Sequence, residues 1–198
     1  DGPTHQPIEH LNSLRMIPNL WVLRPADGLE TAMCYSIALR RKDGPAVLIF
    51  TRQNLPQIER KADFDREVMR KGAYVAYERG GAPKIVFVAT GSEVSLAIQA
   101  AMKLAPDLSV RVVSMPCCEL FRKQDAGYKE SLIPKKAKKV VVEAGSSFGW
   151  ASIVEAAPED MLNISIDRFG ASAPASVIAE KLGLTPDAVA MKVQQRFL

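Results

Sequence analysis

Short apolar runs alternate with helical patterns along the second half of this chain. Each run is rich in Val and Ile, as in a buried parallel strand, and a stretch with helical spacing of apolar residues follows it. The strand-like runs are 85–89, 110–113, 140–142 and 164–166, and the helical stretches are 93–104, 125–132, 149–157 and 175–182. Helices that connect parallel strands cover both faces of the sheet. We therefore predict a mainly parallel, three-layer α/β domain over residues 72–198.

Residues 1–56 carry a shorter version of the same pattern. An apolar run at 19–23 predicts a strand, and the continuous run at 46–50 is typical of a strand buried on both faces of a parallel sheet. Between them, Asp27 is a predicted N-cap with Glu30 three residues later, in the manner of a capping box. Two strands and one helix are too few for a complete sheet. We interpret them as the remnant of a parallel α/β domain.

Residues 57–71 are polar and irregular and predict a linker between the two domains. After the linker, the apolar stretches 73–77 and 84–88 flank Gly80-Gly81. This arrangement predicts a β-hairpin at the start of the second domain. At the other end, Thr185 is a predicted N-cap for the last helix, with a proline at its first position.

Composition and charge exclude several classes of protein. The net charge of +4 is mild, and the basic run 135–139 has no interleaved aromatic residues, so a solvated loop is favoured over a nucleic-acid site. No apolar run approaches the roughly 20 residues that span a bilayer, and the N-terminus has no signal-peptide pattern. The three cysteines show no C-x-x-C spacing. These features predict a soluble, cytoplasmic protein without a nucleic-acid or membrane partner.

The first eleven residues hold the densest group of chemically useful side chains. Gly2 and Pro3 form a predicted turn, and Thr4 is a candidate N-cap for a short helix. His5 would then lie at a helix N-terminus, where backbone N–H groups favour anionic ligands. In the alternative interpretation, Asp1 is a disordered terminus and His5 is a surface turn residue.

Arg52 is a second candidate, because it follows the apolar run 46–50. Ligands of open α/β sheets bind just beyond the carboxyl ends of the strands. A guanidinium there suits a phosphate, although an ion pair with a neighbouring carboxylate explains it equally well.

Two strand-to-helix turns and the histidines are weaker candidates. The turn at 90–93 either offers its backbone N–H groups to an anion or only caps the helix that follows it. Glu143 is either a carboxylate of a binding site or a hydrogen-bond partner of a backbone group or of a second subunit. His5 and His10 do not have the spacing of metal ligands on a helix. Cys117-Cys118 has no histidine within its own domain, so a self-contained hydrolase is disfavoured.

The order of short motifs along the chain resembles that of transketolases. The motifs are Asp-Gly-Pro-Thr-His-Gln-Pro at 1–7, Arg-Pro at 24–25, Thr-Arg-Gln-Asn-Leu at 51–55, Ala-Thr-Gly-Ser-Glu-Val at 89–94, Val-Val-Ser-Met-Pro at 112–116, Val-Glu-Ala-Gly at 142–145 and Phe-Gly-Ala-Ser-Ala-Pro-Ala at 169–175. The resemblance therefore extends over the whole chain.

This resemblance implies a homodimeric enzyme that transfers a two-carbon ketol unit between sugar phosphates. Its cofactors would be thiamine diphosphate and a divalent metal, Mg or Ca. Residues 1–56 would be the end of the pyrimidine-binding domain and residues 72–198 the C-terminal domain. Because the chain starts within a motif, we expect a fragment that lacks the catalytic, cofactor-binding and metal-binding residues and is inactive alone.

Three residues match substrate-binding positions of the family. By that likeness Asp1 binds a substrate hydroxyl, His5 contacts the ketol end of the substrate, and Arg52 binds the sugar phosphate. The alternatives are a dehydrogenase E1 β-subunit or deoxyxylulose phosphate synthase, which share the domain plan, and a non-catalytic dimerisation or anion-binding module.

Overall fold

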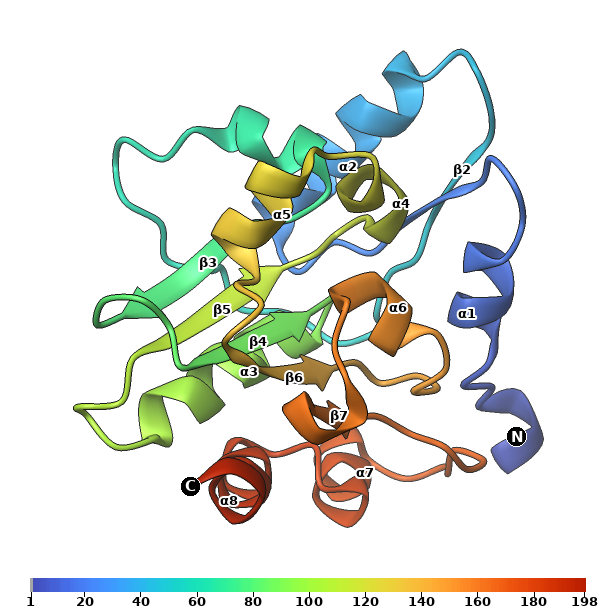
Figure 1. Cartoon of the computed structure of the whole chain (residues 1–198). Helices are drawn as coiled ribbons and strands as arrows, with labels where there is room; N and C mark the ends of the chain where they lie inside the picture. Colours follow the sequence, from blue (N-terminus) through green and yellow to red (C-terminus); the bar gives the residue numbers. More distant parts are fainter. Residues whose placement is uncertain (1) are drawn as a thin grey trace.

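A five-stranded sheet forms the centre of the second domain (Figure 1). The computed structural model describes residues 2–198. The strand order is β3-β5-β4-β6-β7, and only β3 runs antiparallel to its neighbour. The strands are β3 (Tyr74–Arg79), β4 (Ile85–Ala89), β5 (Val110–Ser114), β6 (Lys138–Val142) and β7 (Met161–Ile164). The mainly parallel sheet is therefore confirmed.

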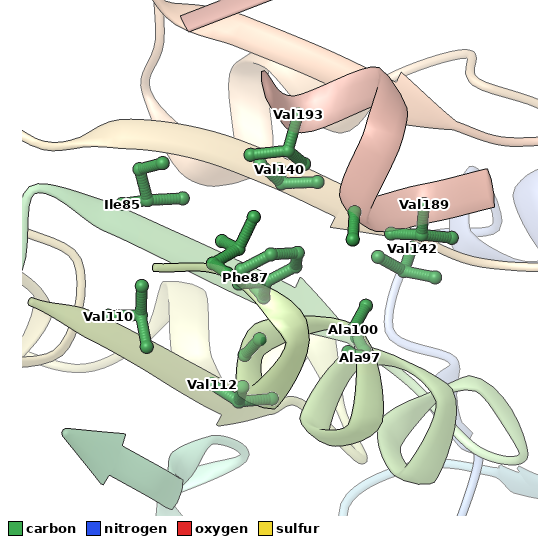
Figure 2. Close-up of a cluster of buried hydrophobic side chains, with 14 of the residues drawn as sticks. Ile85, Phe87, Ala97, Ala100, Val110, Val112, Val140, Val142, Val189 and Val193 are labelled. Carbon is green, nitrogen blue, oxygen red and sulfur yellow. The ribbon is translucent and has the colours of Figure 1, made fainter. Parts of the chain in front are cut away.

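Helices cover both faces of this sheet, because side chains alternate in direction along each strand. Phe87 of β4 points toward α3 (Glu93–Lys103) and α8 (Pro186–Phe197), as Figure 2 shows. Val86 and Val88 point the other way, toward α4 (Cys118–Arg122), α5 (Ala126–Leu132) and α6 (Trp150–Val154). The three-layer α/β architecture is confirmed.

Two helices begin at the caps that the sequence predicts. Asp27 caps α2 (Gly28–Arg40), and Thr185 caps α8, each through its side-chain oxygen. Glu30 reaches back to the N–H of Ala26 rather than to that of Asp27. Helix α7 (Ala175–Leu182) was expected, whereas α4 was not. Three 3-10 helices complete the list for residues 2–198: Pro3–His5, Arg66–Lys71 and Pro158–Asp160.

The predicted hairpin between β3 and β4 is wrong, because β5 lies between these two strands. All five residues of β4 are buried, so this strand lies inside the sheet with a parallel neighbour on each side. Strand β3 is only partly buried and forms the edge of the sheet. The glycines at 80 and 81 allow the chain to turn, but burial decides which strands pair.

The first part of the chain forms a two-stranded parallel sheet of β1 (Trp21–Leu23) and β2 (Ala46–Leu48), with α1 (His10–Arg15) before it. Leu23 of β1 packs on Cys117 and Leu120 of the second domain. The prediction that the second strand is buried on both faces is wrong, because every residue of β2 is only half-buried.

The linker packs against both parts of the chain. Ile58 is buried in the core around β4, and Phe64 lies against the ring of Tyr74, with 5.4 Å between the ring centroids. Arg60 donates to the Asp27 carboxylate at 2.6 Å and to the Tyr74 hydroxyl at 2.8 Å. Glu30 accepts from the hydroxyl of Tyr74 at 2.7 Å. These contacts fix residues 57–71 against α2 of one domain and β3 of the other.

A buried polar cluster joins the two domains at the carboxyl ends of β4 and β6. We call it the carboxyl-edge network, and it consists of Arg15, Arg24, Thr90, Glu93 and Glu143. Arg15 forms a two-pronged ion pair with Glu143, at 2.8 and 2.7 Å, and Arg24 pairs with Glu93. The Thr90 hydroxyl donates to Glu143 at 2.6 Å. Burial alone would raise the pKa of Glu143, but Arg15 lowers it overall through its hydrogen bonds and charge.

Replacing Glu143 with Gln should destabilise the chain by about 3–5 kcal/mol, the usual cost of breaking a buried ion pair. The neutral amide leaves the Arg15 guanidinium, only 8% exposed, without its counter-charge. Urea unfolding of both proteins at neutral pH measures the loss. Glu67→Gln is the matched control, because the Glu67–Arg70 pair is half exposed and should contribute less than about 1 kcal/mol.

The pH dependence of the difference in unfolding free energy between wild type and Glu143→Gln separates a charge effect from a packing effect. Because the folded state lowers the pKa of Glu143 from its ordinary 4.5, its carboxylate stabilises the fold above that pH. That stability is lost as the pH falls through the lowered folded pKa. The difference between wild type and Glu143→Gln should therefore shrink in acid; a difference that stays constant would contradict the ion-pair explanation.

Candidate functional site

The N-terminal motif lies in an exposed 3-10 turn rather than at the start of a helix. His5 ends the single turn Pro3–His5, and α1 begins only at His10. The prediction that Thr4 caps a helix with His5 at its N-terminus is therefore wrong, since Pro7 keeps the turn from continuing as an α-helix. Asp1 lies outside the described residues.

His5 is exposed, and its ring is held only by its neighbour. Its Nδ1 atom lies 3.0 Å from the Thr4 hydroxyl oxygen, and this is the one side-chain hydrogen bond of His5 in the described part of the chain. The Nε2 atom is therefore available to a ligand. An imidazole with one nitrogen oriented by a hydroxyl can donate to or accept from a ligand oxygen.

The path of the motif after His5 is fixed by the second domain. The N–H of Ser146 donates to the carbonyl of Ile8 at 3.1 Å, and the Asn12 side chain donates to the carbonyl of Ser146 at 2.8 Å. A Cβ added to Gly170 would lie 2.5 Å from Cβ of Gln6. The motifs at 1–7, 142–145 and 169–175 therefore lie next to one another although they are far apart in the sequence.

Arg52 lies in the irregular stretch that follows β2 and is exposed. Within residues 2–198 no carboxylate lies within 4.0 Å of its guanidinium, so the alternative of an ion pair with a neighbouring carboxylate is not observed. Residues 51 and 53, on either side of it, line an open cavity of about 230 Å³ next to the start of α2. Arg52 is a cation without an internal partner, as a phosphate-binding residue would be.

The turn at 90–93 is occupied by an arginine of the chain itself. Arg24 donates to the carbonyl and to the hydroxyl of Thr90, at 2.9 and 2.8 Å, and it pairs with Glu93. A Cβ on Gly91 would lie 2.7 Å from Cγ of Arg24. Arg24 therefore fills this turn, although Ser92 at its N-cap position makes no side-chain hydrogen bond to cap α3.

Glu143 has a structural role, but the sequence did not predict its partner. The sequence suggested a backbone group or a second subunit, and the structure places Arg15 there together with the indole N–H of Trp150, which donates at 3.0 Å. All four hydrogen bonds to this carboxylate come from groups of the same chain. Because it is 0% exposed, Glu143 is not available to a substrate.

The described residues contain no metal-binding cluster and no exposed thiol. No group of three His, Cys, Asp or Glu side chains among residues 2–198 could hold a metal ion. All three cysteines are buried, and burial raises the pKa of Cys118 to about 12, so its thiol stays protonated at neutral pH. No helix in the described range is long and apolar enough to cross a bilayer.

Two family models match this chain in tandem. The transketolase pyrimidine-binding domain matches residues 1–57, and the transketolase-like C-terminal domain matches residues 72–185. The second match alone covers more than half of the chain.

Curated relatives and solved structures agree with these matches. The transketolase of Aquifex aeolicus is 48% identical over 199 residues, which cover 100% of this chain and 28% of that protein. The transketolase structure from Leishmania mexicana has a TM-score of 0.86 at 41% identity, covering 99% of this chain and 28% of that one. The structure of Pichia stipitis transketolase in complex with sedoheptulose 7-phosphate has a TM-score of 0.87 at 39% identity with the same coverage.

The chain thus spans less than a third of the length of these relatives, and the likeness runs through both of its domains. Two domain models in the right order, a whole-chain identity of 48% and a shared fold all point the same way. The chain belongs to the transketolase family.

Proposed function

We propose that the protein containing this chain transfers a two-carbon ketol unit between sugar phosphates, as a transketolase. The observation that carries the proposal is the tandem match of the pyrimidine-binding and C-terminal domain models. The similar structure from Pichia stipitis, in complex with a sugar phosphate, supports this substrate class. Because the chain spans 28% of its Aquifex relative, the activity belongs to the longer protein.

In this proposal, residues 1–56 are the last part of the pyrimidine-binding domain, 57–71 the linker, and 72–198 the C-terminal domain. The two separate sheets support this division, with β1 and β2 in one and β3 to β7 in the other. The linker between them contains one 3-10 helix and no strand.

Thiamine diphosphate and a divalent metal, Mg or Ca, would supply the carbanion chemistry of the reaction. The described residues do not fit the metal or the diphosphate, because no cluster of metal-binding side chains is found among residues 2–198. We therefore assign the cofactor-binding and catalytic residues to parts of the protein outside this chain. What this chain contributes is substrate binding.

Three residues would bind the substrate. Arg52 holds the phosphate through its unpaired guanidinium, and His5 contacts the ketol end through the exposed face of its ring. Asp1 would accept a hydrogen bond from a substrate hydroxyl. A cation for the phosphate and an imidazole for the ketol end suit a sugar phosphate, whose charge and reacting carbon lie at opposite ends.

We also propose a cytoplasmic homodimer acting in the pentose phosphate pathway. Tyr35 and Phe50 stack on each other with 5.9 Å between ring centroids, and each remains about half exposed. Leu39 on the same helix as Tyr35 is 82% exposed. Such an apolar surface is suited to burial by the rest of the pyrimidine-binding domain or by a partner subunit.

This chain alone should show no ketol transfer with thiamine diphosphate and Mg²⁺, because the groups that bind and activate the cofactor are not in it. The measurement is a coupled assay with a ketose phosphate donor and an aldose phosphate acceptor. Turnover above the rate of a cofactor-only blank would overturn the assignment of the catalytic residues to other parts of the protein.

Replacing Arg52 with Ala should raise KM for phosphorylated acceptors by roughly 10- to 150-fold, since a hydrogen-bonded charge pair contributes about 1.5–3 kcal/mol. The value of kcat should change little, because the phosphate is remote from the reacting carbon and binds alike in the ground and transition states. The assay uses a full-length transketolase that carries this chain, for example the Aquifex enzyme with its matching part replaced.

Arg66→Ala is the matched control, because Arg66 is also a surface arginine, with its side chain 69% exposed. It should leave KM unchanged for every substrate. Unphosphorylated acceptors should be insensitive to Arg52→Ala. If Arg52→Ala lowers kcat/KM equally for phosphorylated and unphosphorylated acceptors, Arg52 has a structural role and does not bind the phosphate.

Asp1→Ala and His5→Ala should have effects that differ from that of Arg52→Ala. Loss of the Asp1 carboxylate should reduce the discrimination between hydroxyl epimers of the substrate while the preference for phosphorylated acceptors persists. Loss of the His5 ring should lower kcat/KM for phosphorylated and unphosphorylated substrates by the same factor. Epimer ratios that stay at the wild-type value in Asp1→Ala would argue against a hydroxyl contact.

A further inference from the structure

A cavity of about 510 Å³ lies beside α5 and α6 and is lined by Lys139, near the start of β6. Glu143 of the carboxyl-edge network follows the other end of the same strand and does not line the cavity. Its apolar wall is made by the buried side chains of Phe121, Ile133, Ile153 and Val154. The volume is in the range that holds small organic ligands.

A buried lysine without a counter-charge faces this cavity. Lys139 of β6 is only 2% exposed, and its Nζ donates to the carbonyl oxygen of Lys135 at 2.6 Å. Within residues 2–198 no carboxylate lies within 4.0 Å of this Nζ, and the nearby Asp160 pairs with Lys138 instead. Of the three donors of the ammonium group, one has a partner within residues 2–198. Buried charges in folded proteins are normally paired, so a partner is missing here.

The other charged side chains at the cavity do not supply that partner. Glu155 lies 3.8 Å from the Nζ of Lys129, and Glu130 accepts from the backbone N–H of Lys135 at 3.1 Å. The Lys135 side chain is exposed at the rim and has no carboxylate within 4.0 Å among the described residues. Three lysines against two glutamates leave the cavity positively charged.

The titration of Lys139 is consistent with an uncompensated charge. Burial lowers its pKa, and the charges of Asp160 and Glu130 act in the opposite direction without restoring the ordinary value. An anion in direct contact with Nζ would restore it, because an opposite charge within about 4–6 Å favours the charged form.

We propose that this cavity binds a small organic anion, whose carboxylate or phosphate group contacts Lys139 and whose apolar part packs on Ile133, Ile153 and Val154. An aromatic or short aliphatic carboxylate and the corresponding phosphate monoester share the chemistry that the cavity recognises. The anion forms an ion pair with the ammonium group of Lys139, and Lys135 at the rim supplies a second positive charge.

Titration of the full chain with benzoate and with phenyl phosphate tests the proposal, and benzyl alcohol serves as the neutral analogue. Methyl NMR should show saturable shifts of Ile133, Ile153 and Val154 with one or both anions, and none with the alcohol. Lys139→Met keeps an unbranched apolar stem and removes the charge, so it should raise Kd at least tenfold. Lys136→Met is the matched control, because Lys136 is exposed next to the same strand and does not line the cavity, and its Kd should equal that of wild type.

The methyl shifts of the wild-type protein locate the site without reliance on any variant. Shifts confined to those three residues and a response to only one anion would support the proposal and define the preferred headgroup. The absence of saturable shifts up to about 10 mM of either anion would overturn it. Equal Kd values for Lys139→Met and wild type, or equally tight binding of benzyl alcohol, would overturn it as well.

Discussion

The ion pair between Arg15 and Glu143 holds the two domains of this chain in one arrangement. The carboxylate is fully buried and accepts four hydrogen bonds, two of them from Arg15. Such a pair is satisfied only when α1 lies against the carboxyl end of β6. Arg24 adds a second link of the same kind to the turn after β4. The N-terminal motif is thereby attached to the C-terminal domain even though the two are more than a hundred residues apart.

This attachment fixes the backbone next to an exposed turn. His5 has few contacts of its own, but the segment that follows it is held through Ile8 and Asn12 to the loop after β6. The loop at 169–175 approaches from the other side, and Gly170 is required there because a Cβ would collide with Gln6. Binding residues often lie on loops that a rigid scaffold positions. Here that scaffold is the C-terminal domain, and the loop belongs to the N-terminal one.

Local features of the structure were predictable from the sequence, and distant pairings were not. The alternation of strands and helices and the caps at Asp27 and Thr185 follow from residue spacing alone. The supposed hairpin failed because a glycine pair signals a turn but does not say which strand becomes the neighbour. The partner of Glu143 lies 128 residues away, and nothing in the pattern around Arg15 marks it as buried. The positions of His5 and Arg52 came from the family motif, and the structure adds that both are exposed.

The two ends of the central sheet differ in how their charges are paired, and this difference bears on where ligands bind. At the carboxyl end, where open α/β sheets usually place a ligand, Arg24 and Arg15 of the chain itself fill the crevice. A ligand there would have to displace buried ion pairs, and breaking such pairs has a large free-energy cost. At the amino end, Lys139 is buried without a carboxylate partner and faces an empty volume. The usual ligand position at the carboxyl end of the sheet is therefore occupied by contacts to the N-terminal part of the chain. Lys139, which has no carboxylate partner within residues 2–198, lies at the opposite end of the sheet.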